Sequence, residues 1–425
     1  MEENENPKIF KLVKEICKKS DVPVPKIAIS EIQAPNAFVF GRTSKSSTLV
    51  LTKGLLEILD ENEIKAVIGH EIGHIKHKDM IVMTLVGVIP MLAYLLSRSF
   101  IVMKQHLRDE GVLVTYYAHI SPDAWISLLE AGWKNGKFSV INAFPMATES
   151  LQRVTARGKY ALDTSIIVVW KRGVSGSYSA DELYHEAIKR ARQAALDLIK
   201  VGRVGSDLFV GTMAAVLNVF TRYENLYSST GLLDIKTLVT DYVYPATAKA
   251  LAMAFGEFAG ILGEIKRPES LFYLITKTLF PKPKHAKRKM DRTSTALLSI
   301  GTKADIDLLQ KLQIVRKEKE IFYLGEPATA EKKSFDDLLE KKDINPAKPI
   351  IQTSVDALHL LEYYSITLPL NSFLTKFSQL KEEYSSEVEE AINIAAILAK
   401  VLPSTDPEKK ACEEIIARIK GEKLA

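Results

Sequence analysis

The chain has 425 residues, which is long enough for two or three domains. Its 57 basic and 52 acidic residues nearly balance, so the overall charge gives no indication of nucleic-acid binding. The two cysteines, Cys17 and Cys412, stand near opposite ends of the chain and exclude a disulfide framework. The N-terminal residues MEENENPK are acidic and polar, which is not the pattern of a signal peptide.

The first motif that carries chemistry is His-Glu-x-x-His, formed by His70, Glu71 and His74. Asp60 followed by Glu63 predicts the start of a helix just before it. Residues four apart share one helix face, so both imidazoles can bind one ion. Zn²⁺ accepts imidazole and keeps a position for water in catalytic sites, where Glu71 would be the general base. The motif predicts a catalytic zinc site, and two surface histidines that meet by chance are the alternative.

His77 follows closely but is not expected to be a third ligand. It lies seven residues after His70, which is about 10.5 Å along a continuous helix and too far for one ion. We expect His77 to be a polar residue at the helix exit. The third ligand should be a glutamate from a later helix.

Three stretches around this motif carry a family resemblance: PNAFVFGR (35–42), TLVLTKGLLEIL (48–59) and NEIKAVIGHEIGHIKHKD (62–79). Together they resemble the HtpX-type integral-membrane zinc metallopeptidases, over about residues 7–104. The resemblance implies a zincin-like fold, His70 and His74 as zinc ligands, Glu71 as catalytic base, and membrane or misfolded proteins as polypeptide substrates. It also implies that TLVLT (48–52) is an edge strand along which an extended substrate pairs. Asn36 would lie near the cleft as a substrate-binding residue, and an ordinary turn residue after Pro35 is the alternative.

The segment after the motif is a predicted membrane helix. Residues 80–97 are 18 residues without a charge, and the apolar run resumes at 99–103. A spanning helix needs about 17–25 residues, and Pro90 would kink it without forbidding it. We therefore expect residues 80–104 to span the membrane, with the active site facing the cytoplasm as the resemblance implies. A buried hairpin broken at Pro90, in a cytoplasmic protein, is the alternative.

Beyond residue 104, the glutamate motif that supplies the third zinc ligand in HtpX-type enzymes is not recognisable. Glu149 follows an extended run, and Glu186 lies on an amphipathic helical pattern. Both are weak candidates for the third metal ligand. The sequence leaves that ligand open.

Residues 107–175 predict the order strand, helix, strand, strand, at 111–119, 121–136, 137–149 and 161–172. Together with later sequence stretches such as DALHLLEYY (356–364), this part resembles the C-terminal half of an adenine-specific DNA methylase-like family. The resemblance covers the chain from about residue 107 to the end. The resemblance implies a partial Rossmann-like sheet whose last two strands form an antiparallel hairpin. The cofactor loop and the base-binding motif of that family are missing, so we expect no S-adenosylmethionine binding. The first strand, 111–119, would be an open edge.

The remaining residues predict a helical region at 176–325, a polar linker at 326–349 and a helical region at 350–425. The basic stretch 281–292 favours a solvated loop over a phosphate contact, so a nucleic-acid partner is not expected. The predicted fold is mixed α/β and predominantly α, with a metallopeptidase segment at 1–79, the membrane helix at 80–104 and a methyltransferase remnant at 107–175.

The sequence predicts a junction of two unrelated pieces near residues 100–110, a fusion or chimera. The predicted function is that of an HtpX-type zinc metalloendopeptidase, which is impaired if the third ligand is absent. A non-catalytic protein derived from a DNA methylase-like family is the alternative.

Overall fold

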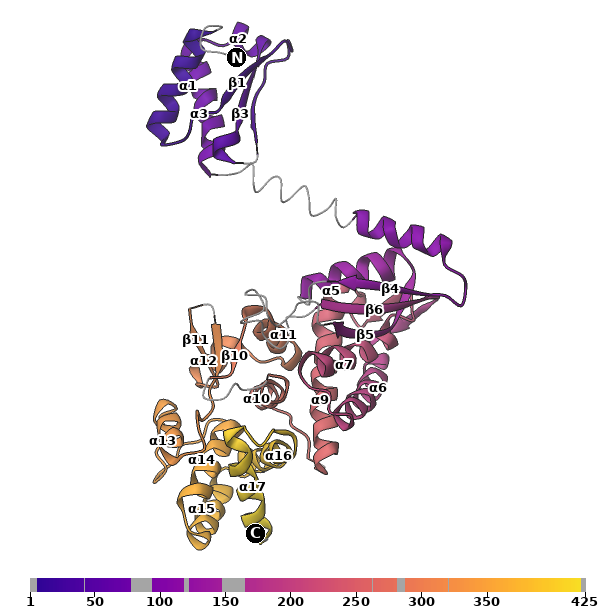
Figure 1. Cartoon of the computed structure of the whole chain (residues 1–425), viewed down its shortest axis with the longest axis vertical. Coiled ribbons are helices and arrows are strands. Elements are labelled where there is room, and N and C mark those ends of the chain that lie inside the picture. The colour runs from indigo at the N-terminus through magenta and orange to yellow at the C-terminus, as the bar shows by residue number, and fades with distance from the viewer. Residues whose placement is uncertain are drawn as a thin grey trace. The chain divides into compact units, whose positions relative to one another are not determined.

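The computed structural model describes residues 6–41, 43–77, 94–117, 122–146, 165–261, 263–280, 287–319 and 321–421. The chain divides into two compact units, Met1–Leu96 and Ser97–Ala425 (Figure 1). The fold is mixed α/β with helices predominating, as the sequence predicts.

The N-terminal unit is a small sheet with two long helices packed against it (Figure 1). Its elements, in chain order, are α1 (Pro7–Ser20), β1 (Lys26–Ser30), β2 (Ala37–Phe40), the 3₁₀ turn η1 (Ser44–Ser46), β3 (Thr48–Thr52), α2 (Lys53–Ile58) and α3 (Glu61–His77). One apolar core joins them, with Val13 from α1, Leu49 and Leu51 from β3, and Ile68 and Ile72 from α3. Helix α3 is thereby fixed against the sheet.

The order of the strands in this sheet is β1-β3-β2. Strand β3 pairs in parallel with β1, where Ile27 lies opposite Leu49, and antiparallel with β2. The segment 48–52 is therefore the central strand, and its prediction as an edge strand is wrong. Its leucines are buried because β3 has a strand on both sides and helices over one face.

The C-terminal unit begins within a helix at residues 94–106, whose Phe100 packs edge-on against Trp170 at a centroid distance of 5.4 Å. The sheet elements of its first part follow: β4 (Val112–Tyr117), α5 (Pro122–Leu129), the π-helix η2 (Glu130–Asn135), β5 (Phe138–Met146) and β6 (Ser165–Arg172). The strand order is β4-β6-β5, and both pairs are antiparallel. The predicted order of strand, helix, strand, strand and the predicted hairpin are confirmed. Among the described residues, no strand pairs with the outer edge of β4.

Helices make up most of the remainder, and two small sheets interrupt the region predicted as helical. The elements are β7 (Ser177–Ser179), α6 (Ala180–Lys200), α7 (Gly205–Phe220), β8 (Asn225–Ser228), β9 (Gly231–Leu232), α8 (Ile235–Thr237), η4 (Leu238–Val243), α9 (Tyr244–Ala259), α10 (Pro268–Leu279), β10 (Lys289–Met290), α11 (Arg292–Thr302), α12 (Ile306–Lys311), β11 (Val315–Glu318) and β12 (Ile321–Leu324). Helix α7 packs on β5 and on α6. These contacts join the helices of the C-terminal unit to its sheet β4-β6-β5.

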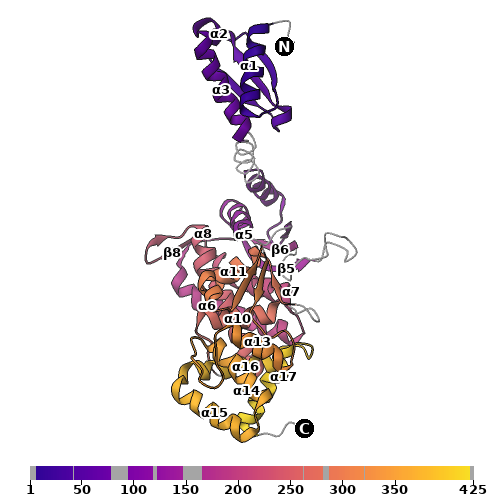
Figure 2. The same cartoon turned by 90° about the vertical axis from the view of Figure 1, so that its left-hand side faces the viewer.

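The helical region predicted at 350–425 is confirmed and holds α14 (Ser354–Thr367), α15 (Leu370–Glu383), α16 (Ser385–Val401) and α17 (Pro407–Lys420), and a further helix, α13 (Lys332–Lys341), precedes it. Figure 2 shows α14, α15, α16 and α17 gathered together. Helix α13 lies inside the predicted linker 326–349 and packs on α14 through the buried Phe335, Leu338 and Leu339. The polar composition of this segment therefore reflects the exposed face of one amphipathic helix, and the segment is not an extended linker.

The predicted membrane segment is only partly within the described residues, because residues 78–93 lie outside them. In the part of the chain that the structure describes, no helix has both the length and the apolar character that crossing a bilayer requires.

Candidate active site

Helix α3 begins as the sequence predicts. The Asp60 carboxylate accepts hydrogen bonds from the backbone N–H groups of Asn62 and Glu63, at 2.8 and 2.9 Å. In return, the Glu63 carboxylate accepts from the N–H of Asp60 at 2.9 Å. This reciprocal capping box satisfies N–H groups that would otherwise lack partners and fixes where the helix starts.

The two faces of α3 differ in character. Ile64, Ile68, Ile72 and Ile75 recur at helical spacing and are buried in the core. Near the other end of the helix, the Ser44 hydroxyl donates to the carbonyl of Ile75 at 3.3 Å. The helix is thus held on one side and at both ends, so the residues on its other side have a fixed position.

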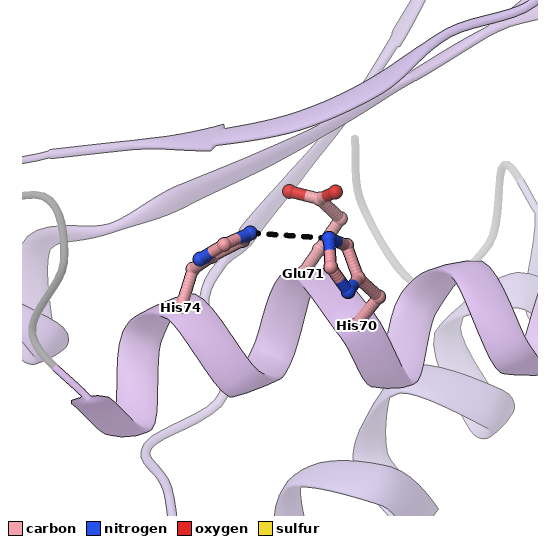
Figure 3. A group of neighbouring side chains, drawn as sticks. All are labelled: His70, Glu71 and His74. Atoms are coloured by element: carbon pink, nitrogen blue, oxygen red, sulfur yellow. Dashed lines mark hydrogen bonds between the residues drawn. The ribbon is translucent and has the colours of Figure 1, made fainter.

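The exposed side of α3 brings the two predicted zinc ligands together (Figure 3). The Nε2 atoms of His70 and His74 lie 3.2 Å apart, and the rings stand edge to face with centroids 4.7 Å apart. Two nitrogens bound to one tetrahedral zinc at about 2.05 Å would be separated by roughly 3.3 Å. The imidazoles therefore already hold the separation that a shared zinc ion requires.

Glu71 completes the group. One of its carboxylate oxygens and the two histidine ligand atoms all lie within 4.8 Å of one another. Glu71 is 9% exposed, whereas His70 is exposed and His74 is half-buried. A carboxylate this close to the histidines, with little access to bulk water, is suited to take a proton from a water held at the same place.

Two glycines leave the helix surface bare beside the histidines. Apart from neighbouring residues of α3 itself, a Cβ atom added to Gly69 or Gly73 would meet no described atom within 4 Å. Each glycine stands next to a histidine in the sequence, so there is room for a bound chain to approach the site closely. His77, the last described residue of α3, is exposed and is not part of this group of described side chains, and its exclusion as a ligand stays a prediction.

Asn36 precedes edge strand β2, and its backbone is firmly held. Its N–H donates to the Thr52 hydroxyl at 2.8 Å, and its carbonyl accepts from that hydroxyl at 3.0 Å. Thr52 also caps α2 by accepting from the N–H of Leu55 at 3.4 Å. The Asn36 side chain is exposed, so it remains accessible to a ligand.

The structure describes only one of the two candidates for the third zinc ligand. Glu149 lies outside the described residues. Glu186 is on α6 in the C-terminal unit, where its carboxylate pairs with Arg190 at 2.9 Å and Arg222 at 3.2 Å. The described group at α3 therefore contains the two histidines and Glu71.

Sequence reasoning missed that β2 is the strand at the edge of the sheet next to the site helix. Helix α3 contacts β2, and β2 pairs on one side only among the described residues. Strand β2 alternates in burial: Ala37 and Val39 pack on the core, while Phe38 and Phe40 are exposed. Alternation of this kind shows only that one face of the sheet is solvated, and the pairing on one side is what makes β2 an edge strand.

The helix defines a class of site, that of His-Glu-x-x-His metallopeptidases. Residues 3–229, more than half of the chain, match the family model for peptidase family M48. The chain therefore belongs to peptidase family M48, a family of metallopeptidases that are generally zinc-dependent. This match extends through residues 107–175, across the predicted junction.

Individual relatives support the HtpX-type resemblance of the N-terminal part. A "Protease HtpX homolog" of Methanothermobacter thermautotrophicus is 44% identical over 119 residues, which are 28% of this chain and 45% of the relative. Proteins of the same name from Thermococcus sibiricus and Methanocaldococcus jannaschii are 41% identical over 88 residues and 42% identical over 97 residues. These matches cover 21% and 22% of this chain and 30% and 34% of the relatives. The chain thus spans less than half the length of these relatives.

No solved structure matches the chain. The resemblance of residues 107–425 to a methylase-like family finds no support in these comparisons.

Proposed function

We propose that the chain is a zinc-dependent metalloendopeptidase of the HtpX type. The observation that carries the proposal is the 3.2 Å separation of the His70 and His74 Nε2 atoms beside the carboxylate of Glu71. Family membership supports the reaction class, the hydrolysis of peptide bonds in a polypeptide.

Three residues of α3 would have distinct roles in the reaction. His70 and His74 would hold the zinc ion through Nε2. Bound zinc supplies a Lewis acid that polarises a carbonyl and lowers the pKa of a water molecule. Glu71 would accept the proton of that water as it attacks the scissile carbonyl carbon, and would then deliver the proton to the departing amine nitrogen. The low exposure of Glu71 favours this role because bulk water competes little for its carboxylate.

The edge strand β2 is the proposed docking strand for the substrate. Extended peptides bind sheet edges by adding one more strand, which satisfies their backbone N–H and C=O groups. Strand β2, Ala37–Phe40, contacts the site helix and offers such an edge among the described residues. Asn36 stands where this edge begins, and the bare surface at Gly69 and Gly73 gives the added strand room. The proposed docking strand is therefore β2, and not the segment 48–52 that the sequence predicted.

The third zinc ligand belongs to this proposal as well. A glutamate from the family-matched part of the chain would complete the three protein ligands usual for catalytic zinc. Glu149 is the preferred candidate, since Glu186 would have to give up its pairs with Arg190 and Arg222. Membrane attachment through residues 80–104, with membrane or misfolded proteins as substrates, completes the proposal.

The test is cleavage of an unfolded fluorescent casein by the purified full-length chain with added zinc. We expect zinc-dependent cleavage, which Glu71→Gln lowers about 10²–10⁴-fold while the zinc content stays unchanged. The matched control His77→Ala, on the same helix, should cleave like the unaltered chain. Absence of zinc-dependent cleavage by the unaltered chain contradicts the proposed function, and full activity of Glu71→Gln removes Glu71 from the mechanism.

A further inference from the structure

A second group of metal-binding side chains lies in the C-terminal unit, within the packed helices α14, α17 and α10. His359 and Glu362 belong to α14, and Glu408 belongs to α17. All three side chains are fully buried. One ligand atom from each lies within 4.8 Å of the others.

The three residues have the chemistry of a mixed nitrogen and oxygen site. His359 and Glu362 are three residues apart on one helix and therefore share a face. Glu408 reaches the same place from a facing helix, and α14 packs directly on α17. Metal sites in helical proteins are commonly built in this way, from side chains that project inward from neighbouring helices. One imidazole with two carboxylates suits Zn²⁺, Mn²⁺ or Fe²⁺.

Two polar atoms of this group have no hydrogen-bond partner among the described residues: Nδ1 of His359 and Oε2 of Glu362. A buried polar atom without a partner costs roughly 1–3 kcal/mol. Such atoms are rare in folded proteins, and two in one cluster point to a missing binding partner.

The hydrogen bonds around His359 indicate which of its two ring nitrogens carries the hydrogen. Tyr273 of α10 donates its only hydroxyl proton to Oε1 of Glu408 at 2.5 Å. Since the Tyr273 oxygen also lies 2.9 Å from Nε2 of His359, Nε2 carries the ring hydrogen and donates to it. Nε2 also lies 3.5 Å from Oε1 of Glu408, and Nδ1 has no partner among the described residues. A ring nitrogen without a partner, opposite one that donates a hydrogen bond, is typical of histidine ligands.

The buried charges around the group do not balance. Five fully or nearly fully buried charged side chains form one network of ion pairs: Glu326, Asp406, Glu408, Lys277 and Arg288. The buried Glu362 carboxylate lies beside this network, with an oxygen within 4.8 Å of the Glu408 carboxylate. Four carboxylates thus face two permanent cations. Buried charges are expensive unless they are compensated, and one divalent cation would bring the network to neutrality.

The neighbouring pair does not supply the missing charge. The ammonium of Lys342 lies 2.7 Å from the carboxylate of Asp356, which neutralises it. The thiol of Cys412 donates to Oε1 of Glu362 at 3.3 Å and so orients the Glu362 carboxylate without changing its charge. The deficit therefore stays with the group of His359, Glu362 and Glu408.

We propose that His359, Glu362 and Glu408 bind one divalent transition-metal ion, of the Zn²⁺, Mn²⁺ or Fe²⁺ class, at a site separate from that on α3. Because all three ligands are enclosed, the ion is structural and joins α14 to α17. It has no part in the proposed proteolysis.

The test removes the first site so that the two do not overlap. The full-length chain carrying His70→Ala and His74→Ala is produced in medium with zinc, manganese and iron, and its metals are counted by mass spectrometry. We expect about one equivalent per chain to remain, because a closed site holds its ion tightly. Glu362→Gln in this background should lower the content about tenfold, while Glu413→Gln, a half-exposed glutamate on α17, should leave it unchanged.

X-ray absorption on the retained ion provides a second measurement that needs no change to the cluster. We expect only nitrogen and oxygen neighbours, with the outer-shell signature of one imidazole. A folded but metal-free His70→Ala, His74→Ala chain overturns the proposal. A sulfur neighbour, or metal retained in folded Glu362→Gln, overturns the assignment of these ligands. If Glu362→Gln does not fold, the metal count and the absorption spectrum of the parent variant decide the question.

Discussion

Truncating Ile72 to alanine tests whether the apolar face of α3 holds the zinc-binding side chains in place. Ile72 is 1% exposed, lies between His70 and His74 in the sequence and packs in the core of the N-terminal unit. Removing a buried isoleucine side chain to alanine costs about 2–5 kcal/mol, and Ile→Val costs about 0.5–1.5 kcal/mol. A loss of ~3 kcal/mol raises the population of the open state roughly 10²-fold.

Hydrogen exchange followed by mass spectrometry reads this effect locally in the full-length chain. Peptides covering α1, β3 and α3 report on the N-terminal unit alone, so unfolding of the C-terminal unit does not confuse the result. We expect Ile72→Ala to speed exchange of the most protected α3 amides roughly 10²-fold, and Ile72→Val roughly 2–10-fold. Ile58→Ala, at an α2 side chain that is 67% exposed, is the control and should change exchange by less than about threefold. If Ile72→Ala exchanges no faster than Ile58→Ala, the core contact of α3 is not what positions the site.

Three further predictions concern other contacts. Thr52→Ala should speed exchange in α2 and β2 by an amount equivalent to roughly 1–3 kcal/mol, because the N–H of Asn36 and the first turn of α2 lose their acceptor; unchanged exchange would show that water replaces the hydroxyl. Neither thiol should react with Ellman's reagent until guanidinium unfolds the chain, because both are buried and burial raises the pKa of Cys17 to about 11 and that of Cys412 well above its usual value; rapid labelling of the native chain would contradict this. Lys277→Met should lower the stability of the C-terminal unit by about 3–5 kcal/mol in thermal unfolding, since it leaves buried carboxylates without their cation; an unchanged melting temperature would mean that the network does not depend on this ion pair.

The local parts of the site could be predicted from the sequence because they depend on spacing within one helix. His70 and His74 are brought together by the helical repeat itself, and the Asp60 cap is a contact between residues three apart. The strand, helix, strand, strand order of residues 112–172 was also predictable, since β-branched and aromatic runs mark the strands.

Long-range pairing could not be predicted in the same way. The segment 48–52 is apolar whether it lies at an edge or in the centre, and only its pairing with both β1 and β2 decides between them. The same holds for the buried network, where Lys277 and Glu408 are 131 residues apart and each alone is typical of a surface residue. The helix α13 was missed because its apolar positions are few and its charges many.

The most direct test of the central claim is the zinc content of the purified full-length chain and of two histidine variants of α3. His74→Ala should lower the zinc content by one equivalent per chain relative to the unaltered protein, because the imidazole of His70 cannot retain the ion once that of His74 is removed. His77→Ala, three residues further along the same helix, should leave the content unchanged. If His74→Ala retains as much zinc as His77→Ala, then α3 does not hold the ion, and the assignment of this helix as the metallopeptidase site is wrong.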